Sequence, residues 1–323
     1  MNERKKPLVI VRGAGDISTG TIHRLFRAGF ELLVLEAERP SAIRRKVAFS
    51  EAVYDGRATV EGALAVRIGS AEEAARCRAD GYIPLIVDPE GESIAFLKPA
   101  VVVDAILAKR NLGTRMDMAP LTIGLGPGFE AGRDVHYVIE TMRGHDLGRI
   151  ISEGSAAPNT GIPGMVGGYG LERVIRAPDA GIFRDGKDIG SFVKAGEVIG
   201  RSEVPGSGTE AVETTGAETP GSGAEAVETT GAETPGSGAE AVETTGAETP
   251  GSMAGTVEVR TVLTGVLRGI IRDGYPVTEG FKLADVDPRK EEQKNCFTIS
   301  DKARCIAGSV LELVCAYRCG IAD

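Results

Sequence analysis

Glycine and acidic residues near the start of the chain have the types and spacing of a phosphate-binding turn. Gly13 and Gly15 follow an apolar run, and Asp16 opens the amphipathic stretch after them. Glycine permits positive φ angles and lets backbone N–H groups approach an anion at the positive end of the following helix. A carboxylate about 20 residues downstream, here Glu36 or Glu38, accepts bonds from a ribose hydroxyl in dinucleotide-binding units. These residues predict a cradle for the phosphate and ribose of a nucleotide.

A strand–loop–helix–strand unit is needed to position these groups, and residues 8–40 have its pattern. The apolar runs Leu8–Val11 and Leu32–Leu35 predict two strands, and apolar residues at i, i+3 and i+4 predict a helix that ends at Gly29. The glycine spacing is G-x-G-x-x-x-x-G, with Ser18 where the dinucleotide pattern has glycine or alanine. A tight turn that only permits close helix packing is therefore the alternative to a nucleotide site.

Arginines follow the two carboxylates. Arg39, Arg44 and Arg45 lie just past Glu38, and the last two fall in a stretch, residues 41–54, that predicts a helix. Guanidinium groups there would clamp a 2′-phosphate or another phosphate of the same ligand. The alternative is a solvated basic face.

A second glycine loop follows the apolar strand that ends near residue 125. Gly124, Gly126 and Gly128 surround Pro127, which stiffens the loop and removes one N–H donor. Two glycine loops at strand ends would face the same crevice if the sheet is doubly wound. Together they predict a shared ligand cleft.

Residues 134–144 predict a helix with three titratable side chains on one face. His136, Glu140 and Arg143 are spaced i, i+4 and i+7, which places them on one side of such a helix. His136 and Glu140 are then candidates for proton transfer. The alternative is a capped surface helix with one ion pair.

Composition excludes several classes of protein. The 323 residues suffice for two or three domains, and no apolar run is long enough to cross a membrane. The net charge of −9 is local: ten glutamates lie in residues 202–257 without a basic residue, so the rest of the chain carries +1. A near-neutral body without tryptophan predicts no nucleic-acid partner and no membrane association. We expect a cytoplasmic protein.

Five cysteines in such a chain argue against a disulfide framework. Cys296, Cys305, Cys315 and Cys319 all fall in the last 28 residues, on or near a predicted helix over 300–320. Cys315 and Cys319 share a helix face, which suits a soft metal or sulfur-like chemistry. Packing in the core is the alternative, because free cysteine is among the most buried residue types.

The second half of the chain predicts an all-β module around a repeat. Residues 190–200 and 261–286 resemble the two halves of a barrel-sandwich hybrid of the lipoyl/biotinyl kind. Three 15-residue copies at 205–249 lie between them and are too poor in large apolar side chains to bury a core, which predicts a disordered acidic loop. The predicted fold class is α/β, a Rossmann-like parallel sheet plus a β-rich barrel-sandwich-hybrid module. The predicted divisions are a Rossmann-like domain (1–130), a glycine-rich middle region (131–175), a split module (176–204 and 253–290), the acidic repeat (203–252) and a C-terminal helix (291–323).

Several long motifs resemble a known family. In order, outside 203–252, they are VRGAGDISTGTIHRLFRAGF, ERPSAIRRKVAFSEAVY, GLGPGF, VIETMRGHDLGR, ADVDPR and ISDKAR. They are similar to the YqeB-like family of selenium-dependent molybdenum hydroxylase system proteins. The opening unit is also loosely similar to the Rossmann part of XdhC-type insertion factors.

This resemblance implies a role in the maturation of molybdenum hydroxylases that need selenium. The implied partners are the hydroxylase apoenzyme and proteins that handle selenium or the cofactor. We expect an accessory factor that binds a nucleotide-bearing ligand, with molybdopterin dinucleotide as the candidate and its pterin on the Gly124–Phe129 loop. An NAD(P)-dependent oxidoreductase and a non-catalytic docking scaffold are the alternatives.

Overall fold

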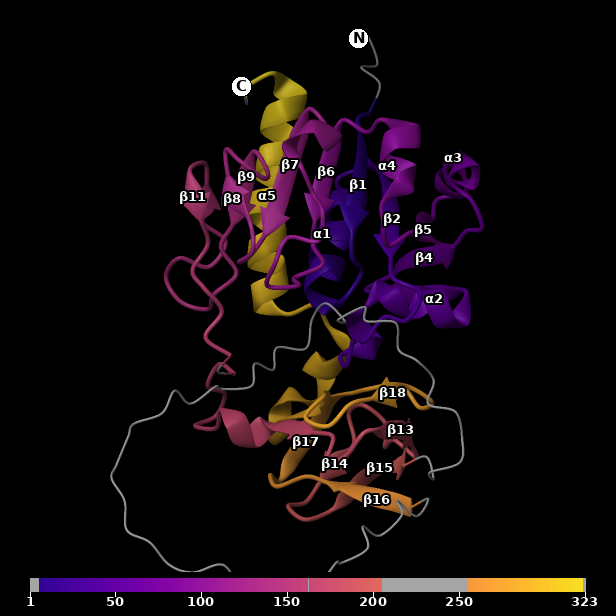
Figure 1. Cartoon of the computed structure of the whole chain (residues 1–323), viewed down its shortest axis with the longest axis vertical. Coiled ribbons are helices and arrows are strands. Elements are labelled where there is room, and N and C mark those ends of the chain that lie inside the picture. The colour runs from indigo at the N-terminus through magenta and orange to yellow at the C-terminus, as the bar shows by residue number, and fades with distance from the viewer. Residues whose placement is uncertain (1–5, 162, 205–254, 322–323) are drawn as a thin grey trace, which may run out of the picture.

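A computed structural model describes residues 6–161, 163–204 and 255–321 of the chain. Its largest element is a nine-stranded sheet at the centre of a mixed α/β domain (Figure 1). This confirms the predicted α/β class. The strands of the sheet are β1 (Leu8–Arg12), β2 (Glu31–Glu36), β3 (Arg57–Val60), β4 (Ala63–Arg67), β5 (Ile83–Val87), β6 (Val101–Asp104), β7 (Leu121–Leu125), β9 (Tyr137–Ile139) and β10 (Ile150–Ile151).

The strand order is β10-β9-β7-β6-β1-β2-β5-β4-β3. The strands from β4 to β9 are parallel, and the antiparallel β3 and β10 lie at the two edges. The order β5-β2-β1-β6-β7-β9 is the 3-2-1-4-5-6 arrangement of dinucleotide-binding domains. Because parallel strands are buried on both faces, they appear in the sequence as continuous apolar runs.

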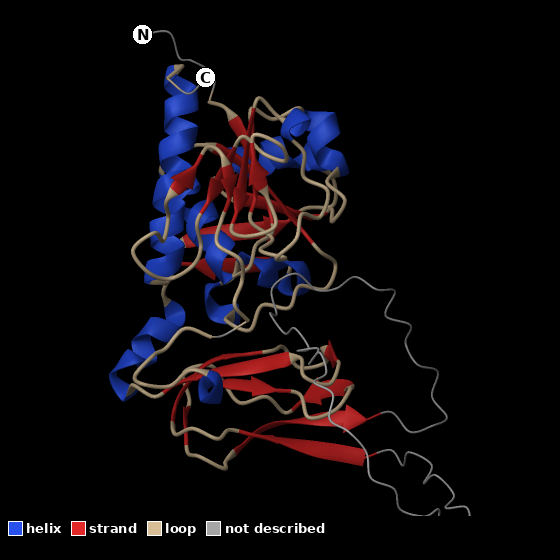
Figure 2. Ribbon diagram, turned by 60° about the vertical axis from the view of Figure 1, so that its left-hand side comes forward, coloured by secondary structure: helices blue, strands red, loops and turns tan. Residues whose placement is uncertain are grey.

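Helices cover both faces of the sheet (Figure 2). The long helices α1 (Asp16–Arg27) and α5 (Asp301–Cys319) pack on the face to which Val9 and Val11 point. Shorter helices, α3 (Ala74–Ala79) and α4 (Glu92–Leu97), lie on the opposite face beside Ile10. The chain therefore leaves this domain, builds a second one and returns to it with α5, as Figure 1 shows by colour.

The second domain, the β module, consists of two four-stranded antiparallel sheets around one apolar core. Phe183, Leu267 and Leu283 are fully buried in that core. One sheet has the order β12-β19-β17-β14 and the other β16-β15-β13-β18. The strands are β12 (Val174–Arg176), β13 (Gly181–Arg184), β14 (Phe192–Val193), β15 (Val198–Val204), β16 (Gly255–Arg260), β17 (Gly265–Ile270), β18 (Pro276–Val277) and β19 (Lys282–Asp287).

The β module packs against the loops that follow β2 in the α/β domain. The Ile270 N–H donates to the Ile43 carbonyl at 2.8 Å, and Arg45 Nε donates to the Ile270 carbonyl at the same distance. Arg272 pairs with Glu51 at 2.9 Å and with Asp55. These contacts place the module at the carboxyl ends of the parallel strands.

The predicted continuous helix over residues 41–54 is wrong. The segment forms two 3-10 turns, η1 (Arg45–Val47) and η2 (Phe49–Glu51), and a single turn of α-helix, α2 (Ala52–Asp55). Tertiary contacts use its backbone: the Phe49 N–H donates to Thr19 Oγ1 and the Ser50 N–H to the Ala14 carbonyl, both at 2.9 Å. The glycine loop and α1 thus hold the segment in its non-helical path.

The predicted helix over residues 134–144 is also wrong. Tyr137–Ile139 form β9, which pairs with β7 in parallel register, and turns follow it. Neighbouring β7 supplies the hydrogen-bond partners that favour the β-branched pair Val138 and Ile139 in a strand.

The remaining elements are short. The sheet continues to Ile151, past the boundary predicted at residue 130, and the acidic repeat at 205–249 lies outside the described residues. Among the described helices, none is long and apolar enough to cross a membrane. The other elements are β8 (Glu130–Ala131), β11 (Gly154–Ser155), η3 (Ala71–Glu73), η4 (Met116–Met118), η5 (Leu171–Arg173) and η6 (Lys290–Phe297).

Candidate functional site

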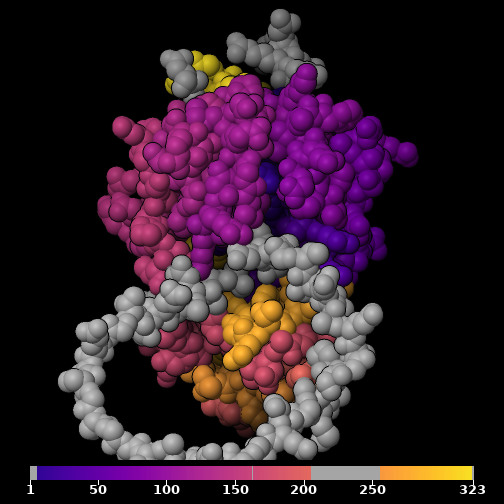
Figure 3. All heavy atoms as spheres, in the orientation of Figure 1, coloured from indigo at the N-terminus to yellow at the C-terminus, as the bar shows by residue number. Residues whose placement is uncertain are grey.

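The strand order reverses between β1 and β6, and the loops at their carboxyl ends form the candidate site. In open α/β sheets, ligands bind in the crevice outside the strand ends at such a switch point. In space-filling view a hollow opens between the magenta and purple parts of the α/β domain, with the indigo start of the chain at its floor (Figure 3). This crevice is called the switch-point crevice below.

The first glycine loop contains one packed and one open glycine. Gly13 has φ +92°, and a Cβ built on it would lie 2.9 Å from the Ala105 carbonyl oxygen. This glycine therefore permits the loop after β1 to touch the loop after β6. Gly15 has φ −64° and no atom within 4 Å of a built Cβ. It is the N-cap of α1, and its helix has no side-chain cap. No side chain therefore caps the first N–H groups of α1, which leaves them available to an anion.

The displaced third glycine of this motif has a different use. A Cβ on Gly20 would lie 2.8 Å from the Cβ of Ala303 in α5. Gly20 therefore lets two helices approach closely, and the spacing that departs from the dinucleotide pattern serves helix–helix contact. Close packing therefore explains Gly13 and Gly20, and it does not explain Gly15.

Glu36 lies at the carboxyl end of β2, where a ribose-binding carboxylate was predicted. Its two oxygens accept hydrogen bonds from the Ala14 N–H at 2.7 Å and the Ala37 N–H at 2.8 Å. Burial raises the pKa of Glu36, and these two bonds act in the opposite direction. Glu36 thus holds the glycine loop in place, whereas Glu38 and Arg39, which follow β2, are exposed.

The second glycine loop also lies at the carboxyl ends of the strands, but neighbouring groups of the chain cover its glycines. A Cβ on Gly124 would meet the Phe129 ring at 2.6 Å, and one on Gly126 would meet Thr141 Oγ1 at 2.6 Å. Gly128 has φ +107° and lies against the backbone of Arg110. Each of the three glycines is therefore accounted for by a neighbour within the chain.

Glu140 and His136 lie at opposite ends of β9. The Glu140 carboxylate accepts bonds from the N–H groups of Thr141, Met142 and Ala157, each at 2.7 Å, so it organises the loops at the crevice edge. His136 precedes β9 and its Nδ1 accepts from the Thr122 N–H at 3.0 Å. Burial lowers the pKa of His136.

The predicted pairing of these two side chains on a helix face does not occur. Four residues in extended conformation separate them by about 13 Å. Arg143 joins neither, and instead donates two bonds to the Asp301 carboxylate, at 2.9 and 3.2 Å. Among the predicted site residues, His136 alone lies at the amino end of its strand, away from the crevice.

A buried ionic cluster at the crevice was not predicted from the sequence. Arg12 ends β1 and lies beside Asp104, which ends β6, with 3.5 Å between their charged groups. Thr114 Oγ1 accepts from Arg12 at 2.6 Å and donates to Asp104 at 2.6 Å, and Arg12 also donates to the Pro89 carbonyl at 3.0 Å. Burial raises the pKa of Asp104, against the effect of Arg12. The sequence feature that could have indicated this cluster is Arg12, a charged residue that ends an apolar strand just before a glycine turn.

The loop after β6 carries backbone strain next to the crevice. Leu107 and Lys109 have φ angles of +64° and +61°, in the left-handed region that non-glycine residues rarely adopt. Such residues cluster at ligand clamps and active sites. The Asn111 amide bonds the backbone of Thr114 in both directions at 2.8 Å and holds this loop in shape.

At the amino end of α1, Asp16 faces a buried arginine. Arg44 lies 3.4 Å from the Asp16 carboxylate and donates to the carbonyls of Asn295 and Thr298, each at 3.2 Å. Burial lowers the pKa of Arg44, and Asp16 acts in the opposite direction. The arginine predicted as a phosphate clamp thus ties α1 to the segment that leads into α5.

The cysteines do not form a metal site among the described residues. In that part of the chain, no group of three or more His, Cys, Asp or Glu residues could hold a metal ion. Cys77 and Cys296 are buried, and burial raises the pKa of both thiols. Cys305, Cys315 and Cys319 are exposed on α5, so core packing is the wrong description of these three.

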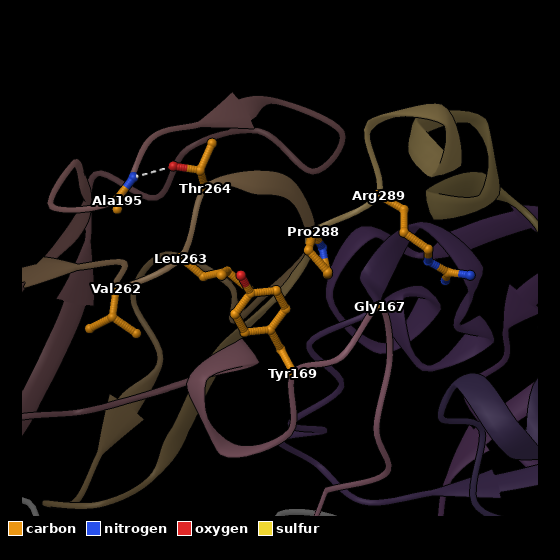
Figure 4. A pocket seen from close by; sticks show the side chains of 8 residues that line it. All are labelled: Gly167, Tyr169, Ala195, Val262, Leu263, Thr264, Pro288 and Arg289. Carbon is orange, nitrogen blue, oxygen red and sulfur yellow. Dashed lines mark hydrogen bonds between the residues drawn. The ribbon is translucent and has the colours of Figure 1, made fainter.

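A cavity of about 570 Å³ lies in the β module, away from the switch-point crevice. Figure 4 shows Tyr169 and Leu263 lining it, with Arg289 near its edge. The Ala195 N–H donates to Thr264 Oγ1 at 2.9 Å on its far side. Gly167 and Tyr169, in the glycine-rich middle region predicted over 131–175, therefore border this cavity.

Comparison with known proteins gives one strong similarity. No protein-family model matches the chain. The chain is similar to the uncharacterized protein YqeB of Escherichia coli K12. The two are 44% identical over 305 residues, which are 94% of this chain and 47% of YqeB. The chain thus spans about half the length of this relative.

Similarities to solved structures are weak. The ectoine utilization protein EutE (DoeB) of Ruegeria pomeroyi is 11% identical, with 87% of this chain and 85% of that one covered and a TM-score of 0.24. An aspartoacylase family protein of Mesorhizobium loti is 10% identical, with 88% and 87% covered and the same TM-score. Neither similarity bears on the fold or the function of this chain.

Proposed function

We propose that the chain binds a nucleotide-bearing ligand in the switch-point crevice and acts as an accessory factor in the maturation of molybdenum hydroxylases that need selenium. The observation that carries the ligand-binding proposal is the uncapped amino end of α1 at the reversal of strand order, with open space at Gly15. The hydroxylase part rests on the motifs that resemble the YqeB-like family. The hydroxylase apoenzyme and the proteins that supply selenium or cofactor are the proposed partners.

The first turn of α1 would hold the ligand's phosphate. Its unpaired N–H groups and the helix dipole together favour a negative charge there. Glu36 would bind the ribose, because each carboxylate oxygen has a second lone pair beyond the bond it already accepts from Ala14 or Ala37. The loop that carries Leu107 and Lys109 would form the opposite wall.

Molybdopterin dinucleotide is the proposed cargo, and its nucleotide end fits the crevice better than its pterin end fits the second loop. The phosphate would bind at the open turn before α1, and the ribose would bind the Glu36 carboxylate. Gly124, Gly126 and Gly128 are each covered by a neighbour, so that loop would meet the pterin through side chains rather than through glycine backbone.

We further propose that the β module is a barrel-sandwich hybrid. Support comes from its two four-stranded antiparallel sheets and from the half-motifs on both sides of residues 205–254. Unpaired thiols at all five cysteines suit a reducing compartment, and we propose a cytoplasmic location.

Equilibrium binding by titration calorimetry tests the ligand proposal. Wild-type protein would be titrated with molybdopterin dinucleotide, NAD(P) and ATP, and the Gly15→Val variant would be compared. A valine side chain at Gly15 would fill the open space without backbone strain, because φ there is −64°. We expect at least tenfold weaker binding, and the poorer N-cap should lower the free energy of unfolding by only about 1 kcal/mol.

The outcomes separate the candidate functions. Wild-type protein that binds none of the three ligands would overturn the crevice assignment. Preferential NAD(P) binding with consumption of NADH would instead support an oxidoreductase, for which the 3-2-1-4-5-6 strand order is the favouring observation. A Gly15→Val variant that still captures the hydroxylase from cells and supports its maturation would support a docking scaffold.

A further inference from the structure

Two arginines of the β module share one buried carboxylate where the module meets the α/β domain. Arg173 Nη2 donates to both oxygens of Asp285, at 2.7 and 3.0 Å. Arg268 Nη1 lies 3.4 Å from one of the same oxygens. The side chains of Arg173 and Asp285 are 6% and 7% exposed, and that of Arg268 is 20% exposed. Asp285 is therefore bound closely by Arg173 and only weakly by Arg268.

A third arginine reaches this group from the α/β domain. Gly269 follows Arg268 in β17, and a Cβ built on it would lie 3.2 Å from Arg44 Cγ. Burial is the main cause that lowers the pKa of Arg44, and the charges of Arg268 and Asp285 also act on it, in opposite directions. Arg44, Arg173, Arg268 and Asp285 are called the boundary cluster below.

The boundary cluster carries surplus positive charge. Three further carboxylates near it each have an arginine of their own within 3.4 Å: the pairs are Asp16–Arg44, Asp287–Arg289 and Asp301–Arg143. Asp285 is thus left to two arginines, and among the described residues it is the one ion-pair partner of Arg268. Two guanidinium groups on one carboxylate have a net charge of +1.

Unused hydrogen-bond donors accompany this charge. In the part of the chain that the structure describes, the Nε atoms of Arg44 and Arg173 are buried and have no hydrogen-bond partner. Both side chains are only 6% exposed, so bulk water solvates them poorly. Buried charges in proteins are normally paired and hydrogen-bonded. Surplus charge together with unused donors therefore favours the binding of an anion.

We infer that the boundary cluster binds an oxyanion of the phosphate class, and that Arg268 is the residue that holds it. A planar guanidinium donates two parallel bonds to a phosphate oxygen pair. Arg268 is the most exposed of the three arginines, so it is the one that an anion from solvent can reach. The inference does not require the proposed function. Free phosphate and the phosphate group of the crevice ligand have the same chemistry here, and the experiment separates them.

Urea unfolding at constant ionic strength tests the inference by the sign of one effect. In chloride buffer, Arg268→Met removes the surplus charge and leaves the bond between Arg173 and Asp285, so the urea midpoint should not fall. In phosphate buffer the wild-type midpoint should rise, because a ligand that binds only the folded state stabilises it. The midpoint of Arg268→Met should not rise, and Arg268→Lys should keep part of the wild-type rise. The matched control Arg201→Met removes a β-module arginine that pairs with Asp185 at 3.0 Å, and it should respond as wild type does.

Titration calorimetry with inorganic phosphate measures the same site directly. Loss of a charge-assisted hydrogen bond should weaken phosphate binding about 10- to 100-fold in Arg268→Met. If Gly15→Val binds phosphate as wild type does, the oxyanion is free phosphate at a site of its own. If Gly15→Val and Arg268→Met both bind more weakly, the oxyanion is the phosphate group of the crevice ligand.

Three results would overturn the inference. One is a wild-type midpoint that phosphate does not raise, and another is equal phosphate affinity in Arg268→Met and wild type. The third is a lower midpoint of Arg268→Met in chloride buffer, which would show that Arg268 serves the fold. None of these results bears on dinucleotide binding by wild-type protein, so the proposed function would stand or fall by its own titration.

Discussion

The two glycine loops both lie at the carboxyl ends of parallel strands, and they differ in what covers them. In the first loop, Gly15 has nothing within 4 Å of a built Cβ, and the helix that follows is uncapped. In the second, Phe129, Thr141 and Arg110 fill the places where Cβ atoms would lie. In the first loop, Gly13 is required for packing and Gly15 lies in an open turn, whereas all three glycines of the second loop are required for packing.

This difference shows that a glycine-rich loop at a strand end can serve either ligand binding or packing within the chain. A glycine is required wherever backbone approaches closely, whether the approaching group is a ligand or another part of the chain. Each loop is also held by a carboxylate that accepts hydrogen bonds from backbone N–H groups, Glu36 at the first loop and Glu140 at the second. The loops are therefore built alike, and only the covering groups distinguish a candidate site from a packed turn.

Gly128→Ala should have the largest effect on stability. The substitution adds a Cβ within 2.6 Å of Arg110 Cα at a φ of +107°. Backbone strain and overpacking together should lower the free energy of unfolding by about 3 kcal/mol, measured by urea denaturation. Gly132→Ala is the control, since φ is +83° there but the space is open, and it should cost about 1 kcal/mol. Equal losses would show that packing does not explain the second loop.

Glu36→Gln should have an intermediate, pH-dependent effect at the first loop. Replacing one carboxylate oxygen by an amide group removes an acceptor for Ala14 or Ala37, at a cost of about 1 kcal/mol. The folded-state pKa of Glu36 is raised, so its contribution is fully present below the unfolded pKa and is lost as the pH rises through the folded pKa. Wild-type stability relative to the variant should therefore fall from pH 4 upward. Parallel stability curves in urea titrations would contradict this assignment.

His136→Asn should have the smallest effect on the site. The asparagine oxygen can accept from the Thr122 N–H as His136 Nδ1 does, so stability should fall by less than about 1 kcal/mol. Ligand binding in the switch-point crevice should stay within twofold of wild type, because His136 lies at the amino end of β9 and the crevice lies at the carboxyl ends of the strands. A tenfold weaker affinity would restore the predicted role of this histidine at the site.

Local pattern was enough to locate β1, β2 and β7, the helices α1 and α5, and the turn at Gly13–Gly15. Continuous apolar runs mark buried parallel strands, and Ser300 with Gly320 marks the ends of α5. The pattern failed over 41–54 and 134–144, where bonds to α1, the glycine loop and β7 set the backbone. Over 41–54, tertiary partners outweighed helix propensity, whereas over 137–139 the β-branched residues favour the strand that pairs with β7.

Only the tertiary structure decided which groups meet at the switch-point crevice. Arg44 lies 251 positions before Asn295 in the sequence, and the packing of the segment before α5 lets Arg44 bond both Asn295 and Asp16. Arg12 meets Asp104 because β1 and β6 are neighbours in the sheet. Whether a glycine faces solvent or a neighbour depends on such long-range contacts, for which the glycine itself carries no signal. The sequence therefore supplied the turn at Gly15, and the packing of helices and strands around it made it a candidate site.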